Sequence, residues 1–144
     1  MHIDQPLSLL GGLTADQFMK RHWQRKPLLV RQAIPGMQPL VARQRLWELA
    51  ALEEVESRIV AQDPKQGWRL QRGPLAGRAI PPRTRPGWTL LLQGMDLHES
   101  AVHELLQQFR FVPEARLDDV MSSYATDGGG VGPHVASYHV VLLL

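Results

Sequence analysis

The residues of this chain that are best suited to chemistry lie near its C-terminal end. Four glycines and a proline in segment 128–133 lead directly into His134, which leaves an imidazole sterically open to a ligand. Non-haem ferrous sites use two His and one carboxylate, with open positions for oxygen and a co-substrate. His134 is therefore a candidate metal ligand. The alternative is a surface or capping His, which is the more common role of a single His after a glycine turn.

A second ligand is missing where a strand would supply it. Side chains alternate between the two faces of a strand, so a partner for His134 would stand at residue 136. That residue is Ala136, which has no donor atom, and the next residues on the same face would be Tyr138 and Val140. His139 would point to the opposite face. Such a strand offers one ligand where a ferrous site needs three.

The other titratable residues do not form a clear cluster in the sequence. His98 and His103 are five residues apart on an expected helix, so they do not form an i, i+4 pair and are expected to be solvated. Asp118 and Asp119 are adjacent and would point to opposite faces of a strand, so they are not an acid–base pair in one pocket. One of the two is expected to hold a basic partner.

The composition is that of an ordinary soluble globular domain, with 144 residues, 44% hydrophobic and 21% charged. The absence of Cys excludes disulfides and thiolate metal sites. No signal peptide and no membrane-spanning run is recognised, so a cytoplasmic protein is expected. The net charge of +2 gives no direct nucleic-acid signal, although the arginines between residues 69 and 85 meet no acid in that segment.

The N-terminal half is expected to contain two helices and a short strand. A capping box predicts a helix that begins after Thr14. The apolar residues 28–30, between a proline and a Pro-Gly turn, predict a short buried strand. The spacing of Leu46 and Leu49 predicts a helix over 41–52 with these two side chains in the core.

The C-terminal half is expected to be richer in strands. The four tryptophans, at positions 23, 47, 68 and 88, are expected in the core because each lies in an otherwise apolar element. The expected order is a hairpin of strands over 57–60 and 68–71, a proline-rich surface loop over 73–87, a strand over 88–93 buried on both faces, a helix over 97–109 and a strand over 116–124.

The last five residues, Val140–Leu144, are all apolar. Such a run is typical of a central strand, which needs neighbours at both edges and cover on both faces. We expect those partners to follow Leu144, as in an incomplete copy of a longer protein. The alternative is a final strand that enters a sheet already built by earlier segments.

A series of motifs occurs in order along the chain, and it is densest from residue 109 onward. The motifs lie at 22–30, 56–60, 73–74, 88–93, 117–122, 128–134 and 137–138. The series is similar to the N-terminal part of the bacterial ribosomal oxygenases, JmjC-type cupin proteins that hydroxylate an arginine in a large-subunit ribosomal protein. The resemblance implies an α+β fold: a mainly β, incomplete double-stranded β-helix with N-terminal helices. Residues 1–87 would form the lead-in, and residues 88–144 the truncated first part of the β-helix.

The resemblance also implies Fe(II) and 2-oxoglutarate as cofactors and a ribosomal protein as partner. In that family the His at the position of His134 is the first iron ligand, an Asp two residues later is the second, and a distal His completes the triad. This chain has Ala136 at the second position and lacks the distal His, so no catalytic residue is assigned.

Three hypotheses follow from the sequence. The chain descends from an arginine hydroxylase, or it is a truncated, inactive fragment that self-associates through exposed sheet edges, or it is a cupin-derived interaction module. The interaction module would use segment 69–85 against ribosomal RNA.

Overall fold

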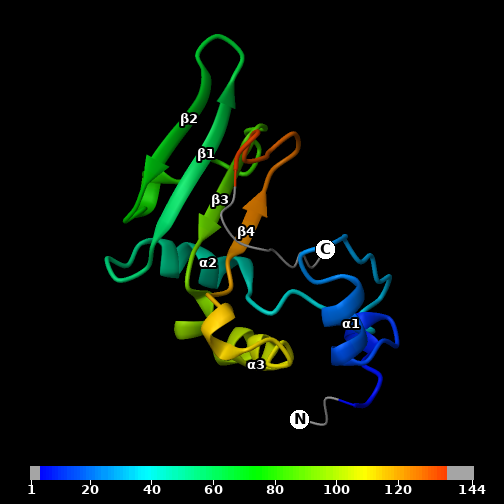
Figure 1. Ribbon diagram of the computed structural model, residues 1–144. Helices are drawn as coiled ribbons and strands as arrows, with labels where there is room; N and C mark the ends of the chain where they lie inside the picture. Colours follow the sequence, from blue (N-terminus) through cyan, green and yellow to red (C-terminus); the bar gives the residue numbers. More distant parts are fainter. Residues whose placement is uncertain (1–3, 136–144) are drawn as a thin grey trace.

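The computed structural model describes residues 4–135, in which four strands form one antiparallel sheet (Figure 1). The sheet order is β2-β1-β3-β4, and the strands are β1 (Ser57–Asp63), β2 (Gly67–Arg72), β3 (Trp88–Leu92) and β4 (Ser122–Ala125). The predicted hairpin and the buried strand after it are confirmed. Together with three α-helices, this sheet gives the expected α+β class. Because β1 pairs with β3, the sheet joins segments on both sides of residue 87.

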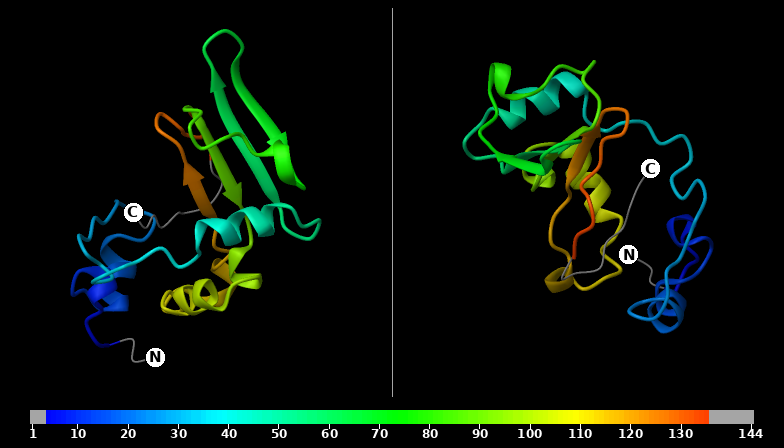
Figure 2. Two further views of the ribbon diagram at one scale, coloured as in Figure 1. Left: turned by 180° about the vertical axis from the view of Figure 1, so that it is seen from behind. Right: turned by 90° about the horizontal axis from the view of Figure 1, so that it is seen from above.

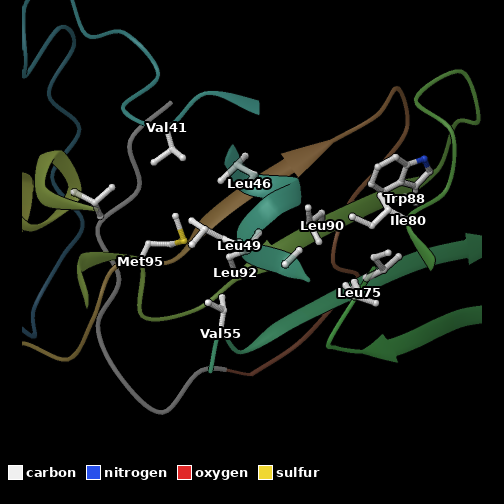
Figure 3. Packing of buried hydrophobic residues seen from close by; sticks show 13 residues of the cluster. Val41, Leu46, Leu49, Val55, Leu75, Ile80, Trp88, Leu90, Leu92 and Met95 are labelled. Atoms are coloured by element: carbon white, nitrogen blue, oxygen red, sulfur yellow. The ribbon is translucent and has the colours of Figure 1, made fainter. Parts of the chain in front are cut away.

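Helix α2 (Arg43–Ala50) packs against one face of the sheet and closes the main core (Figure 3). Leu46 and Leu49 are buried there, as predicted. On β3, residues 88, 90 and 92 belong to the same core, while Thr89 and Leu91 are buried on the opposite face. A strand buried on both faces consists of a nearly continuous apolar run. The sequence therefore predicts β3 correctly.

The proline-rich segment 73–87 contains no strand, as predicted, but it is more than a surface loop. Leu75 is fully buried and Ile80 nearly so. The amide of Leu75 donates to the carbonyl of Ala50 at 2.6 Å, so the loop is tied to the end of α2. Prolines prevent ladder pairing but leave the apolar side chains of a loop free to pack.

Helix α1 (Ala15–Arg21) begins after Thr14 with the predicted capping box, in which both hydrogen bonds with Gln17 are 3.1 Å long. The predicted strand at 28–30 is wrong. That segment pairs with no strand within residues 4–135, and Leu29 is 77% exposed. Both views of the ribbon place α1 to one side of the sheet, away from β2 (Figure 2).

Two further elements differ from their predicted bounds. The helix expected over 97–109 is a 3₁₀ turn, Met95–Leu97, followed by α3 (Ser100–Gln107). The strand expected over 116–124 begins only at Ser122. Before it, the amide of Val120 donates to Asp96 Oδ1 at 2.9 Å, so a side chain replaces a ladder partner. None of the helices within residues 4–135 is long and apolar enough to cross a membrane.

Candidate metal site

The glycine turn that precedes His134 is fixed to the start of β3. The hydroxyl of Thr126 donates to the carbonyl of Trp88 at 3.1 Å and accepts from the amide of Trp88 at 3.2 Å. The amide of Gly129 donates to the carbonyl of Thr126 at 2.7 Å, and the amide of Gly87 donates to the carbonyl of Asp127 at 2.9 Å. These bonds hold the first half of the turn against the sheet.

Two positions of the turn require glycine because other atoms approach too closely. A Cβ on Gly129 would collide with the carbonyl oxygen of Trp88. Gly132 has φ of +70°, and a Cβ there would lie 2.8 Å from the indole of Trp68. The turn therefore lies between the start of β3 and the indole of Trp68 on β2. His134 follows the turn directly.

His134 is exposed and its ring orientation is set by the turn. Its Nδ1 lies 3.0 Å from the carbonyl oxygen of Gly132. A carbonyl oxygen only accepts, so Nδ1 carries the proton in this contact and Nε2 of the neutral ring keeps a free lone pair. Metal-binding imidazoles use this arrangement, in which one ring nitrogen donates to a carbonyl and the other binds the ion.

The described residues do not complete a ferrous site. Within residues 4–135 no group of three His, Asp or Glu side chains is placed to hold a metal ion. The other residues considered for this strand, Ala136, Tyr138 and His139, lie outside the described residues, as does the apolar run 140–144. The described part of the chain therefore offers an iron ion one imidazole ligand, His134, and not the three ligands of a ferrous site.

Of the adjacent residues Asp118 and Asp119, only the second has a structural role that the described fold shows. Asp119 accepts from the amide of Gly94 at 2.6 Å and from the side chain of Gln93 at 3.0 Å, whereas Asp118 is exposed. Among the described residues, no basic side chain forms an ion pair with either aspartate. Arg58 instead donates to Gln93 Oε1 at 3.2 Å, so the cation and the carboxylate are linked through an amide.

The two histidines near α3 do not form a site. His103 is exposed and contacts the side-chain amide of Gln107 at 2.9 Å, as expected for a solvated residue. His98 is half-buried.

The tryptophans fall into two groups. Trp88 is fully buried and stacks edge-on with the partly buried Trp47, as predicted. Trp23 is half-buried. Trp68 is 45% exposed, so its predicted core position is wrong. It lies on β2, an edge strand of the sheet in which every residue is exposed.

A shallow hollow of about 230 Å³ lies beside the glycine turn and was not predicted. Its lining consists of Arg83, Thr84, Pro86 and residues 124–127. It holds one guanidinium and one carboxylate but not His134. No sequence signal marks Thr126 or Asp127, because only the pairing of β4 with β3 brings them to the proline-rich loop.

Comparison with known families finds a match to the JmjC domain over residues 104–144. Among curated proteins, the chain is similar to the ribosomal protein uL16 3-hydroxylase of Escherichia coli, with 34% identity over 88% of this chain and 33% of the relative. It is also similar to a Haemophilus influenzae protein named "Probable ribosomal oxygenase", with 31% identity over 91% of this chain and 32% of that protein. The chain thus spans about a third of the length of these relatives.

Solved structures of a ribosomal oxygenase are also similar to this chain. The E. coli ribosomal oxygenase YcfD matches with a TM-score of 0.77 and 31% identity, over 85% of this chain and 33% of YcfD. YcfD in complex with cobalt and 2-oxoglutarate matches with a TM-score of 0.76 at the same identity and coverage. The matched part of the chain therefore has the fold of the corresponding part of a JmjC protein.

Proposed function

The chain is related in sequence and in fold to the N-terminal third of the bacterial ribosomal oxygenases, and from this premise we propose that it provides the first metal ligand of such an enzyme. The enzyme would be an Fe(II)- and 2-oxoglutarate-dependent hydroxylase of an arginine in a large-subunit ribosomal protein. The observation that carries the proposal is the geometry of His134. It follows a turn bonded to β3, and its Nδ1 is engaged by Gly132, which leaves Nε2 free for a metal.

The role of the described residues is positioning. Thr126 and Gly129 hold the turn on β3, and Gly132 orients the imidazole. When bound, iron with 2-oxoglutarate supplies oxygen activation. We further propose that residues 1–87 are the lead-in and residues 88–144 the first part of the β-helix. The cytoplasm, where ribosomal proteins are made, is the proposed location.

A second candidate is a catalytically inactive fragment or interaction module, and the ligand count favours it for the 144-residue chain by itself. The sequence has Ala136 where the resemblance requires Asp. A single neutral imidazole does not hold Fe(II) in a productive geometry. In this alternative the fold is kept and the chemistry is absent.

The metal-ligand role of His134 is tested by cobalt titration followed by calorimetry. The natural chain is expected to bind Co(II) with a dissociation constant of about 1 mM or weaker, and Ala136→Asp to bind about tenfold more tightly, because a carboxylate is added beside the imidazole. Adding His134→Ala to Ala136→Asp should abolish that gain, while adding His103→Ala should not. A gain that survives His134→Ala would show that His134 is not the ligand.

The family activity is tested with a chimera in which residues 1–135 are joined to the remaining two-thirds of the E. coli relative. The chimera is expected to release succinate from 2-oxoglutarate in the presence of Fe(II) and a uL16 peptide, and its His134→Ala variant is expected not to. A folded chimera that binds Co(II) through His134 but turns over no 2-oxoglutarate would contradict the hydroxylase proposal.

A further inference from the structure

Charge is distributed very unevenly along the chain. Segment 57–87 contains seven basic residues and one acid, a net charge of +6, whereas the whole chain has +2. The other 113 residues therefore carry a net charge of −4. The basic residues of the segment are Arg58, Lys65, Arg69, Arg72, Arg78, Arg83 and Arg85. A cluster of this kind on one part of a fold is the electrostatic footprint of a polyanion site.

The fold gathers this segment at one edge of the sheet (Figure 1). It comprises β1, the edge strand β2 and the loop that returns to β3. The loop is fastened beside β1, where the amide of Gln62 donates to the carbonyl of Gly87 at 2.9 Å. All of β2 and the arginines at 78, 83 and 85 are exposed. The sheet edge and the loop thus both present guanidinium groups to solvent.

A cleft of about 360 Å³ lies between β1, β2 and this loop. Its lining consists of Ile59, Ala61, Arg69, Leu70, Gln71, Pro81 and Arg85. In the register of the sheet, Ala61 stands opposite Arg69 and Ile59 opposite Gln71. The floor of the cleft is thereby apolar, and two guanidinium groups and an amide line its walls. An apolar floor lowers the local dielectric and strengthens the attraction of an anion to the arginines.

The two arginines of the cleft are exposed and have one acidic residue near them. Neither Arg69 nor Arg85 forms an ion pair with a carboxylate in the part of the chain that the structure describes. The nearby acid is Asp63, whose carboxylate accepts from the amides of Lys65 at 2.8 Å and Gln66 at 3.0 Å. These bonds, and then the positive field of the two arginines, lower the pKa of Asp63.

We propose that the cleft between β1, β2 and the 81–87 loop, with the arginines around it, binds the phosphate backbone of RNA. A guanidinium donates two parallel hydrogen bonds to a phosphate, so Arg69 and Arg85 suit one phosphate group. Three more arginines lie outside the lining of this cleft, at positions 72, 78 and 83. One small anion would not need these additional positive charges. Several separate cations suit the repeated charges of a nucleic-acid backbone. This activity is additional to the protein hydroxylation proposed above and does not depend on it.

The test is the binding of the 144-residue chain to a fluorescein-labelled single-stranded RNA of 12 nucleotides, measured by anisotropy across a salt series. The double variant Arg69→Ala/Arg85→Ala should bind about tenfold more weakly in 50 mM salt. Its plot of log affinity against log salt should be shallower by about 0.7, since the two arginines are proposed to neutralise one phosphate and each neutralised phosphate of a single strand contributes about 0.7. The matched control Arg21→Ala/Arg25→Ala removes the same charge from exposed positions near α1 and should change the affinity less than twofold.

Three results would overturn the proposal. One is no binding of RNA at 100 μM chain in 50 mM salt. Another is an equal loss in the control pair, which would show a response to net charge alone. The third is equal binding of a labelled poly-glutamate peptide, which would make the ligand a carboxylate polymer. Circular dichroism melts of both variants should match the natural chain, because all four arginines are exposed.

Discussion

Strands β3 and β2 belong to the same sheet, separated only by β1, yet they have opposite surroundings. Every residue of β3 is buried and every residue of β2 is exposed. β3 receives α2 on one face and the glycine turn on the other, whereas β2 is an edge strand with exposed arginines on it. The sheet thus separates two tasks. β3 carries stability and anchors the turn that leads to His134, whereas β2 keeps its side chains exposed for the proposed binding.

The largest expected effect comes from removing the same side chain on each strand. Leu90→Ala on β3 should lower the free energy of unfolding by about 2–5 kcal/mol, because it leaves a cavity in the core. Leu70→Ala on β2 should change it by about 0.5 kcal/mol or less, since that side chain is 55% exposed. Urea unfolding measures both. Similar losses for the two variants would contradict the division between the strands.

The contact between β3 and the glycine turn is tested with neighbouring glycines. Gly129→Ala should lower the free energy of unfolding by about 1–3 kcal/mol, because its Cβ meets the Trp88 carbonyl and the turn must shift. Gly130→Ala is the matched control, since nothing lies within 4 Å of its Cβ, and it should be nearly neutral. If Gly129→Ala is equally neutral, the turn does not rest on β3.

The buried hydroxyl of Thr89 tests how hydrogen bonding at β3 contributes to stability. Its Oγ1 has no hydrogen-bond partner within the described part of the chain, so Thr89→Val should raise the free energy of unfolding by about 1 kcal/mol. Thr126→Val should lower it by about 1 kcal/mol, because the Thr126 hydroxyl bonds both the amide and the carbonyl of Trp88. Thermal melts of the two variants that shift in the same direction would contradict this assignment.

The smallest effect on the free energy of unfolding is expected from Asp63, in the turn between β1 and β2. The amides of Lys65 and Gln66, and then Arg69 and Arg85, lower the pKa of Asp63 from its ordinary 3.8. A carboxyl whose pKa is lower in the folded state stabilises the fold above pH 3.8, and this contribution is lost as the pH falls through its folded value. The stability difference between the natural chain and Asp63→Asn should therefore shrink below pH 4. A difference that stays constant from pH 7 to pH 2 would exclude this linkage.

The sequence predicts the parts of the fold that have a strong local cause. The capping box at Thr14, the hairpin and the buried strand over 88–92 are confirmed because each depends on nearby residues. The strand at 28–30 and the core position of Trp68 are wrong, because burial at those places depends on whether another segment runs alongside. An edge strand and a central strand can have similar apolar content.

The candidate site is predictable only in its first element. The glycine turn and His134 stand out in the sequence, but the anchors of the turn, Thr126 and the Trp88 backbone, do not. They are brought together by strand pairing across 38 residues of chain. The basic cleft has the same origin, since Arg69 and Arg85 are neighbours only because the 81–87 loop lies beside β1.

The central proposal is that the chain supplies the scaffold and the first metal ligand of a ribosomal oxygenase, and that residues 4–135 do not by themselves form a complete metal site. Its most direct test is succinate release from 2-oxoglutarate by the purified chain, supplied with Fe(II), oxygen and a uL16 peptide. The account predicts no succinate above the rate of the same mixture without protein. Catalytic succinate release that disappears in the His134→Ala variant would contradict it.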